Sequence, residues 1–98
     1  MPYTKDTLDT LRADGEFGDG TNNPILVTPG AADVIGEEIS GIFFEFMNFE
    51  NWDPNWDSDD LHEIGIIDFD GTDIMFKITP ADLKNGTFSL TFMLPTEW

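Results

Sequence analysis

The alternation of apolar and polar residues is clearest in the last third of the chain, where it predicts three consecutive strands. Residues 63–78 hold two runs of β-branched and aromatic residues on either side of Asp70-Gly71, a dipeptide suited to a tight hairpin turn. Residues 87–94 then alternate between large apolar side chains and Ser or Thr, as a half-buried antiparallel strand does. The pattern therefore predicts an antiparallel meander over residues 63–94.

The register of the predicted hairpin has two solutions. A two-residue turn pairs Ile67 with Ile74 but leaves Gly65 opposite Phe76, where a glycine has no side chain to offer. One further loop residue would instead align larger apolar side chains across the two strands. The pattern alone leaves both registers open.

The first 28 residues predict a helix, a loop and a short strand. Residues 4–13 have two leucines three apart and Thr4 as an N-cap, which favours a short helix. Residues 14–23 concentrate Gly, Asp and Asn and therefore form a loop. This loop lacks the lysine and the following helix of a phosphate-binding loop, and Pro24 instead starts a strand over residues 24–28.

Residues 29–49 fit both a helix and a strand. Their isoleucines and phenylalanines recur at helical steps, but two glycines interrupt the run and its aromatic density suits a buried strand. An internal similarity, Thr-Pro followed by Ala-Asp and later by Gly, links residues 28–41 with residues 79–86 and favours a helical turn before a strand in each copy. We therefore predict a short helix near 30–38, a strand at 42–49 and a helical turn at 80–84.

Together these elements predict an α+β fold. We expect residues 1–98 to form one small domain, because 98 residues with 40% hydrophobic side chains suffice for one core. Its antiparallel sheet has four or five strands, built on the C-terminal meander, with short helices on one face. An exposed sheet edge leaves open a homodimer through strand pairing.

Charge is the feature of composition that changes this picture most. The chain has 20 Asp and Glu against 4 Lys and Arg, a formal net charge of −16, so at most four carboxylates can pair one-to-one with Lys or Arg. Such a surface disfavours nucleic acid and membranes as direct partners and favours basic proteins or divalent cations. With 0 cysteines, no signal-like N-terminus and no apolar run of membrane-spanning length, we predict a soluble cytoplasmic protein.

Residues 66–73, Ile-Ile-Asp-Phe-Asp-Gly-Thr-Asp, carry the one short stretch that resembles a catalytic motif. They resemble the first motif of the haloacid dehalogenase-type phosphatases, which implies Asp68 as nucleophile and Asp70 as acid/base. That family places the motif at the start of a parallel α/β domain with a downstream lysine and further metal-binding acids, whereas here antiparallel strands follow. We therefore predict a hairpin turn, no enzymatic activity, no catalytic residues and no cofactor.

The acidic loop, residues 50–63, has the alternating oxygen-bearing side chains of a cation site. Asp53, Asn55, Asp57 and Asp59 follow the odd-position spacing of an EF-hand loop. The glycine at position six and the glutamate at position twelve of such a loop are missing. We favour a solvated loop, with weak divalent-cation binding as the alternative, and a multi-histidine site is excluded because the chain has 1 His.

The acidic loop is also the predicted partner-binding surface, because it combines two tryptophans with acids. Tryptophans dominate interface energetics, and carboxylates meet Lys or Arg on a partner. The predicted contact residues are Trp52, Asp53, Trp56, Asp57, Asp59, Asp60 and Glu63. The opposing interpretation is that both indoles form the internal core of the loop, and for Trp98 we expect packing back onto the domain.

The functional hypothesis is a non-enzymatic interaction protein that inhibits or sequesters a basic, nucleic-acid-binding protein by charge mimicry. Duplex DNA carries one charge per ~1.7 Å of axis, and rows of carboxylates imitate that field. Small acidic phage-encoded inhibitors of CRISPR or restriction enzymes, and immunity proteins against nuclease toxins, use this logic, and the chain resembles them in type only. The alternatives are a structural or halophilic housekeeping domain with an acidic solubilising surface, and a β-domain that weakly binds divalent cations.

Overall fold

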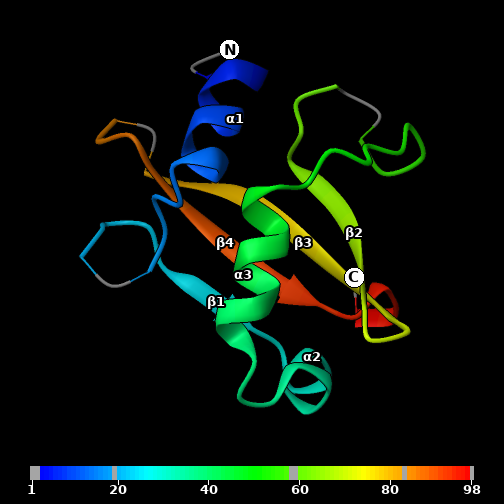
Figure 1. Ribbon diagram of the computed structural model, residues 1–98. Coiled ribbons are helices and arrows are strands. Elements are labelled where there is room, and N and C mark those ends of the chain that lie inside the picture. Colours follow the sequence, from blue (N-terminus) through cyan, green and yellow to red (C-terminus); the bar gives the residue numbers. More distant parts are fainter. Residues whose placement is uncertain (1–2, 19, 58–59, 83, 98) are drawn as a thin grey trace.

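The predicted meander forms most of the sheet. The computed structural model describes residues 3–18, 20–57, 60–82 and 84–97. Strands β2 (Ile64–Phe69), β3 (Thr72–Asp82) and β4 (Thr87–Met93) pair antiparallel in chain order. A short strand, β1 (Ile25–Val27), adds to the outer side of β4 in the parallel direction, which gives the order β1-β4-β3-β2 (Figure 1). The fold is α+β, as predicted, with a sheet that is mostly antiparallel.

Three helices precede the meander in the described part of the chain: α1 (Lys5–Ala13), α2 (Pro29–Ile35) and α3 (Ile39–Met47). The predicted cap of α1 is present. The Thr4 side chain accepts a hydrogen bond from the backbone N–H of Thr7, and the Thr7 side chain accepts one from the backbone N–H of Thr4. Figure 1 shows α3 crossing the face of the sheet, with α1 and α2 towards opposite ends. In the described residues, these helices are all too short or too polar to cross a membrane.

The predicted strand at 42–49 is wrong, because residues 42–47 belong to α3 and residues 48–49 follow the end of this helix. The helical spacing of the apolar residues was the better guide: Ile42 and Phe46, four residues apart, are fully buried against the sheet. Neither glycine interrupts a helix. Gly36 ends α2 with φ +58°, and Gly41 lies on the exposed side of α3.

The predicted helical turn at 80–84 is also wrong, because β3 continues to its end at Asp82. Pro80 pairs with Phe88 of β4, and the register shifts between Pro80 and Asp82. Such an irregularity accommodates a proline, which has no N–H to donate to the ladder. The similarity with residues 28–41, where Thr28 and Pro29 do start a helix, therefore does not extend to structure.

The hairpin adopts the register of the two-residue turn. Ile67 pairs with Ile74, and Gly65 stands opposite Phe76. This pairing is favourable because the Phe76 ring covers the glycine: a β-carbon at Gly65 would lie 2.5 Å from that ring and 2.7 Å from Phe49. The glycine that made the register look poor is thus required by it.

A core of aromatic and aliphatic side chains fills the space between α3 and the sheet. Phe46 of α3 meets Phe76 and Phe92 edge to face, with ring centroids 4.9 and 6.1 Å apart. Alternate residues of β3 and β4 form the sheet side of this core, as the period-2 pattern requires. Burying these side chains is the main favourable term in folding.

Two polar residues tie the front half of the chain to its end. The buried Asn23 accepts from Phe88 N–H of β4 at 2.8 Å and donates to the Glu16 carbonyl at 2.6 Å. Near the C-terminus Glu97 accepts from the Thr28 hydroxyl at 2.6 Å and the Gly30 N–H at 3.2 Å. The hydrogen bond from Thr28 lowers the pKa of the Glu97 carboxyl. Loop 14–23 and α2 are therefore held by residues that the sequence pattern did not single out.

Candidate functional site

The acidic loop is shaped by its own carboxylates. The carbonyl of Asp53 accepts from Trp56 and Asp57 N–H at 2.9 and 2.7 Å, and its side chain accepts from Asn55 N–H at 2.9 Å. Asp57 is buried and accepts from the N–H of His62 at 2.9 Å. The Asp53 carboxylate is therefore engaged with the backbone of Asn55 and the Asp57 carboxylate with the backbone of His62. Asp59 of the predicted cation set lies outside the described residues.

Trp52 is part of the internal packing of this loop. Its ring lies parallel to the His62 imidazole, with centroids 3.9 Å apart at 7°, and it meets Phe49 edge to face at 4.7 Å. The Arg12 guanidinium of α1 lies 4.9 Å from the centroid of the same indole. Trp52 thus joins the loop to the core and to α1.

His62 sits among acids from both the loop and α1. Its Nδ1 lies 2.7 Å from the Asp9 carboxylate, which also accepts from Arg12 at 2.8 Å. Burial on its own raises the pKa of Asp9, but the hydrogen bonds from Arg12 and His62 outweigh that effect, so the pKa of Asp9 is lowered. Arg12 is itself buried, and its Nε has no hydrogen-bond partner among the described residues.

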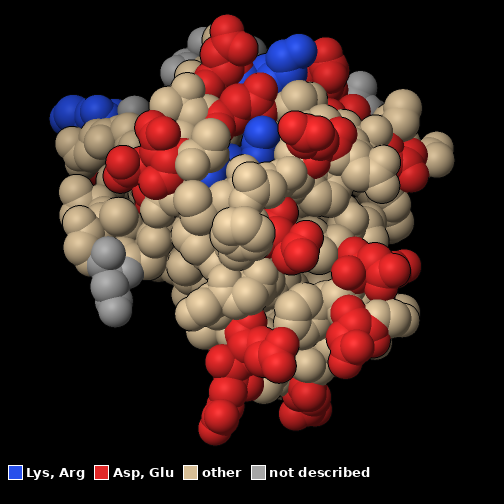
Figure 2. Space-filling view, viewed as in Figure 1, with Lys and Arg blue, Asp and Glu red and all other residues tan. Residues whose placement is uncertain are grey.

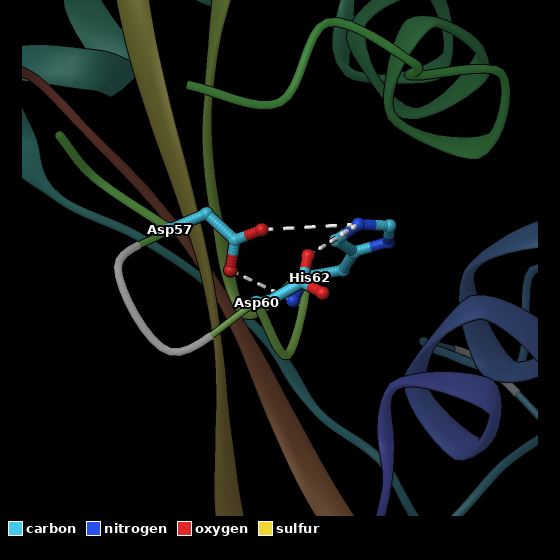
Figure 3. A group of neighbouring side chains, drawn as sticks. All are labelled: Asp57, Asp60 and His62. Atoms are coloured by element: carbon cyan, nitrogen blue, oxygen red, sulfur yellow. Dashed lines mark hydrogen bonds and ion pairs between the residues drawn. The ribbon is translucent and has the colours of Figure 1, made fainter. Parts of the chain in front are cut away.

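Two further carboxylates face the other nitrogen of the imidazole (Figure 3). His62 Nε2 lies 3.8 Å from an oxygen of Asp57 and 3.8 Å from an oxygen of Asp60. These atoms are of the types that hold divalent metals, and they lie within 4.8 Å of one another. Lys5 lies 3.6 Å from Asp60 and Arg12 lies 2.8 Å from Asp9, so two cations offset part of the negative charge here. We call Asp9, Asp57, Asp60 and His62 the brace, because these residues tie the acidic loop to α1.

The predicted contact residues are therefore divided. Trp52 and Asp57 face inward, Trp56 is half-buried, and Asp53 and Asp60 are exposed. Glu63 is half-buried, and its carbonyl accepts from Ile78 N–H in β3. Asp59 and Trp98 lie outside the described residues. The acidic loop is largely an architectural element that leaves single acids at its surface.

The outward side of α3 presents unpaired acids beside exposed apolar groups. Glu37 and Glu38 precede the helix and Glu45 lies on it; all three are exposed, and within the described part of the chain none has an ion-pair partner. Phe44 is 65% exposed next to Glu45. Figure 2, which views this side, shows carboxylates around a broad uncharged centre, with the cations in the upper part of the view, towards α1 and the turn between β3 and β4.

Two grooves open on the surface that α3 borders. The α3 groove, of about 300 Å³, lies between α3 and β2 and is lined by Glu45, Asn48, Phe49, Glu50, Asn51, Ile66, Ile67 and Asp68. The β1 groove, of about 490 Å³, is lined by Gly18, Pro24, Ile25, Val27 and Ile39. The first therefore gathers three carboxylates, and the second is apolar.

Sequence reasoning missed both grooves, because it placed residues 42–49 inside the sheet. The helical spacing of residues 39–47 was the available signal. In a helix, this spacing puts Phe44 on the side opposite Ile42 and Phe46, and the structure shows Phe44 exposed there. No protein-family model, curated protein or solved structure matches the chain. Function therefore has to be inferred from this surface alone.

Proposed function

We propose that this chain is a non-enzymatic inhibitor that binds a basic, nucleic-acid-binding protein by presenting carboxylates in place of phosphates. The observation that carries the proposal is the unpaired acidic surface around α3, represented by Glu37, Glu38 and Glu45. Carboxylates without internal partners repel one another and lower the stability of the free protein. A basic partner removes that repulsion on binding, and the charge then serves recognition.

Three carboxylates on this side of the molecule line the α3 groove. Glu45, Glu50 and Asp68 come from three different segments and line one groove of about 300 Å³. A Lys or Arg side chain entering this groove would be surrounded by carboxylates, with the apolar wall of Phe49 against its methylene groups. Such a groove accepts the side chains with which nucleic-acid-binding proteins hold phosphates.

The positions of the cations also favour the α3 side as the contact surface. Lys5 and Arg12, half of the 4 Lys and Arg, are paired with acids beside the acidic loop. The negative potential is therefore least compensated on the side of α3, away from those pairs (Figure 2). We place the contact surface there, with Asp53 and Asp60 of the acidic loop at its margin.

The experiment is capture of partners from host lysate at about 50 mM and 500 mM salt, followed by competition. A captured partner is purified, bound to labelled duplex DNA or RNA, and titrated with this protein while fluorescence anisotropy is followed. We expect release of the nucleic acid, with an inhibition constant that weakens at least tenfold at the higher salt. A partner that keeps its nucleic acid, or no basic partner at either salt, overturns the proposal.

A matched pair of variants separates shape from net charge. Glu45→Gln, Glu50→Gln and Asp68→Asn together empty the α3 groove of charge; Asp6→Asn, Asp14→Asn and Asp82→Asn remove the same charge from exposed sites elsewhere. We expect about a tenfold or greater loss of inhibition from the first triple and less than about threefold from the second. Equal losses would mean that net charge alone acts.

The housekeeping alternative makes a different prediction about salt. If the acids only keep the domain soluble in brine, its melting temperature climbs steadily into molar salt and no partner is displaced from nucleic acid. If the acids serve binding, the melting temperature levels off once the Debye length falls to ~3–8 Å, between about 0.15 and 1 M salt. Differential scanning fluorimetry over this range distinguishes the two.

A further inference from the structure

The outer side of β1 is an unpaired sheet edge. The Pro24 carbonyl accepts from Leu90 N–H, and Thr28 N–H donates to the Phe92 carbonyl, so alternate residues of this segment face β4. The backbone groups of Ile25 and Val27 therefore point the other way. Among the described residues no backbone hydrogen bond reaches that side. The edge offers donors and acceptors to one more strand.

The β1 groove lies against the same two residues. Ile25 and Val27 line it on the sheet side and Ile39, 37% exposed, lines it on the helix side. An added strand sends alternate side chains to each face of the sheet, so one set would enter this groove. On the opposite face the set between them would meet Leu26, which is 52% exposed. Backbone pairing and side-chain pockets thus coincide at one edge, as strand addition requires.

The charges beside the groove select the occupant. Glu37 and Glu38 directly precede Ile39 on one wall, and Glu16 lies two residues before Gly18 on the other; all three are exposed. A second copy of this chain carries a net charge of −16 and is repelled, as is a nucleic acid. A segment with Lys or Arg around apolar residues is attracted.

We infer that the edge of β1 binds an extended basic segment of a partner protein as an added strand, with its alternate apolar side chains in the β1 groove. The inference rests on the proposed function and names how the partner is held. Main-chain hydrogen bonds to Ile25 and Val27 fix the segment, and Glu37 and Glu38 hold its Lys or Arg side chains.

The test uses a defined probe, the capped peptide Lys-Lys-Val-Thr-Val-Lys-Lys, in a heteronuclear NMR titration of the full chain. In an extended strand its two valines and its first and last lysines point to the same face, so the valines can enter the β1 groove while these lysines reach the acids beside it. We expect the largest amide shifts at residues 25–27 and 39, and saturation at micromolar to millimolar concentration. The matched control peptide has Glu in place of Lys and should cause no shift. Shifts confined to other acidic residues, with β1 unaffected, would overturn the inference.

Val27→Pro and Val27→Thr form the matched pair of variants. Proline removes the outward N–H at an edge position where no internal partner needs it, whereas threonine keeps the N–H and the shape of valine. We expect Val27→Pro to weaken peptide binding at least tenfold and Val27→Thr less than about threefold, with both amide spectra otherwise unchanged. Equal binding by the two variants would contradict strand addition.

A second measurement covers the case in which the proline variant fails to fold. The probe peptide is methylated at alternate backbone nitrogens, in two versions that block opposite edges of its strand. If it binds by strand addition, one version binds as the parent does and the other at least tenfold more weakly. Equal affinities of the two would reject the added strand without any change to this chain.

Failure of this inference and failure of the proposed function look different. If Val27→Pro still releases nucleic acid from the captured partner, the inhibitor function stands and the β1 edge is not its contact. If the peptide binds β1 but no partner loses its nucleic acid, the edge is a binding site and the inhibitor function falls. A dimer in sedimentation that Val27→Pro dissociates would assign the edge to a second copy and overturn the inference.

Discussion

The acidic loop and the side of α3 are both rich in carboxylates, yet they use them in opposite ways. In the loop two of the acids have partners within the molecule: Asp57 accepts from the N–H of His62, and Asp60 lies 3.6 Å from Lys5 of α1. Around α3, Glu37 and Glu38 have no ion-pair partner in the described part of the chain. A high density of acids in a sequence therefore does not mark a contact surface until their partners are known.

Aromatic side chains repeat this contrast. Trp52 is held between the core and the imidazole of His62, whereas Phe44 projects into solvent with 65% of its surface exposed. A tryptophan among acids is typical of an interface anchor, and in this structure the Trp52 ring packs against Phe49 and His62 of its own chain. The exposed ring that suits an interface comes from the segment that the sequence pattern assigned to the interior.

The most damaging change we expect is Trp52→Ala. It removes the ring contacts with Phe49 and His62, and also the indole over which the Arg12 guanidinium lies. We therefore expect a loss of about 3 kcal/mol in the free energy of unfolding. Urea denaturation followed by circular dichroism measures it. Trp56→Ala, at a half-buried residue outside the core, is the control and should cost about 1 kcal/mol. If Trp52→Ala cost no more stability than Trp56→Ala, Trp52 would not be part of the packed core and the loop would again be a candidate contact surface.

Gly65→Ala is expected to follow in size. Its β-carbon would overlap the rings of Phe76 and Phe49, at 2.5 and 2.7 Å, so a loss of about 2 kcal/mol is expected. The matched control is Gly41→Ala, on the exposed side of α3, where a β-carbon meets nothing within 4 Å. There alanine should raise stability by about 0.5–1 kcal/mol, because it favours helix more than glycine does. A loss of stability in Gly41→Ala would indicate that another part of the protein packs over this side of α3.

Asp9→Asn tests the brace at the acidic loop through its pH dependence. Because the pKa of Asp9 is lowered in the folded state, its ionised form stabilises the fold. That contribution is complete above the ordinary pKa of 3.8 and is lost as the pH falls through the folded-state value. We expect the variant to lose about 1 kcal/mol at pH 7, allowing for solvent screening of a partly exposed group.

The difference in stability between Asp9→Asn and the parent protein should begin to narrow below about pH 3.8 and shrink further as the pH falls through the lower folded-state pKa of Asp9. Thermal unfolding at pH 7, 5 and 3 measures it. A gap that stays constant over this range would mean that asparagine disturbs packing and that the ionised carboxylate contributes nothing.

The smallest effect, and one of opposite sign, is expected at the other region. Glu37→Gln with Glu38→Gln relieves repulsion between unpaired acids, so stability in about 10 mM salt should rise by a few tenths of a kcal/mol. In about 0.5 M salt this gain should vanish, because screening has the same effect. A loss of stability at low salt would show that these glutamates have internal partners and belong with the acids of the loop.

The sequence predicted the elements whose cause is local. The cap at Thr4, the start of α2 at Thr28 and the alternation along β4 each depend on residues a few positions apart, and all three are present. The hairpin register could not be chosen, because the covering of Gly65 by Phe76 depends on packing between strands. Residues 42–49 were misassigned because burial, and not aromatic content, decides between helix and strand there.

The candidate site was harder to predict than the fold. The sequence drew attention to the acidic loop, but the packing of this loop depends on α1: Asp9 lies 53 positions before His62, and Arg12 lies 40 positions before Trp52. The β1 groove joins residues 18, 24–27 and 39 only after α3 has packed on the sheet. A surface assembled from distant segments leaves no motif in the sequence.

The parallel pairing of β1 with β4 has a consequence for the order of events during synthesis. Ile25 pairs with Leu90, and the neighbouring bond from Phe88 to Asn23 spans 65 positions. A ribosome adding ~5–20 residues per second therefore completes residues 25–27 several seconds before their partner strand exists. Until then neither the β1 edge nor its groove has a fixed form, so a nascent chain lacks the proposed strand-addition site and acquires it last.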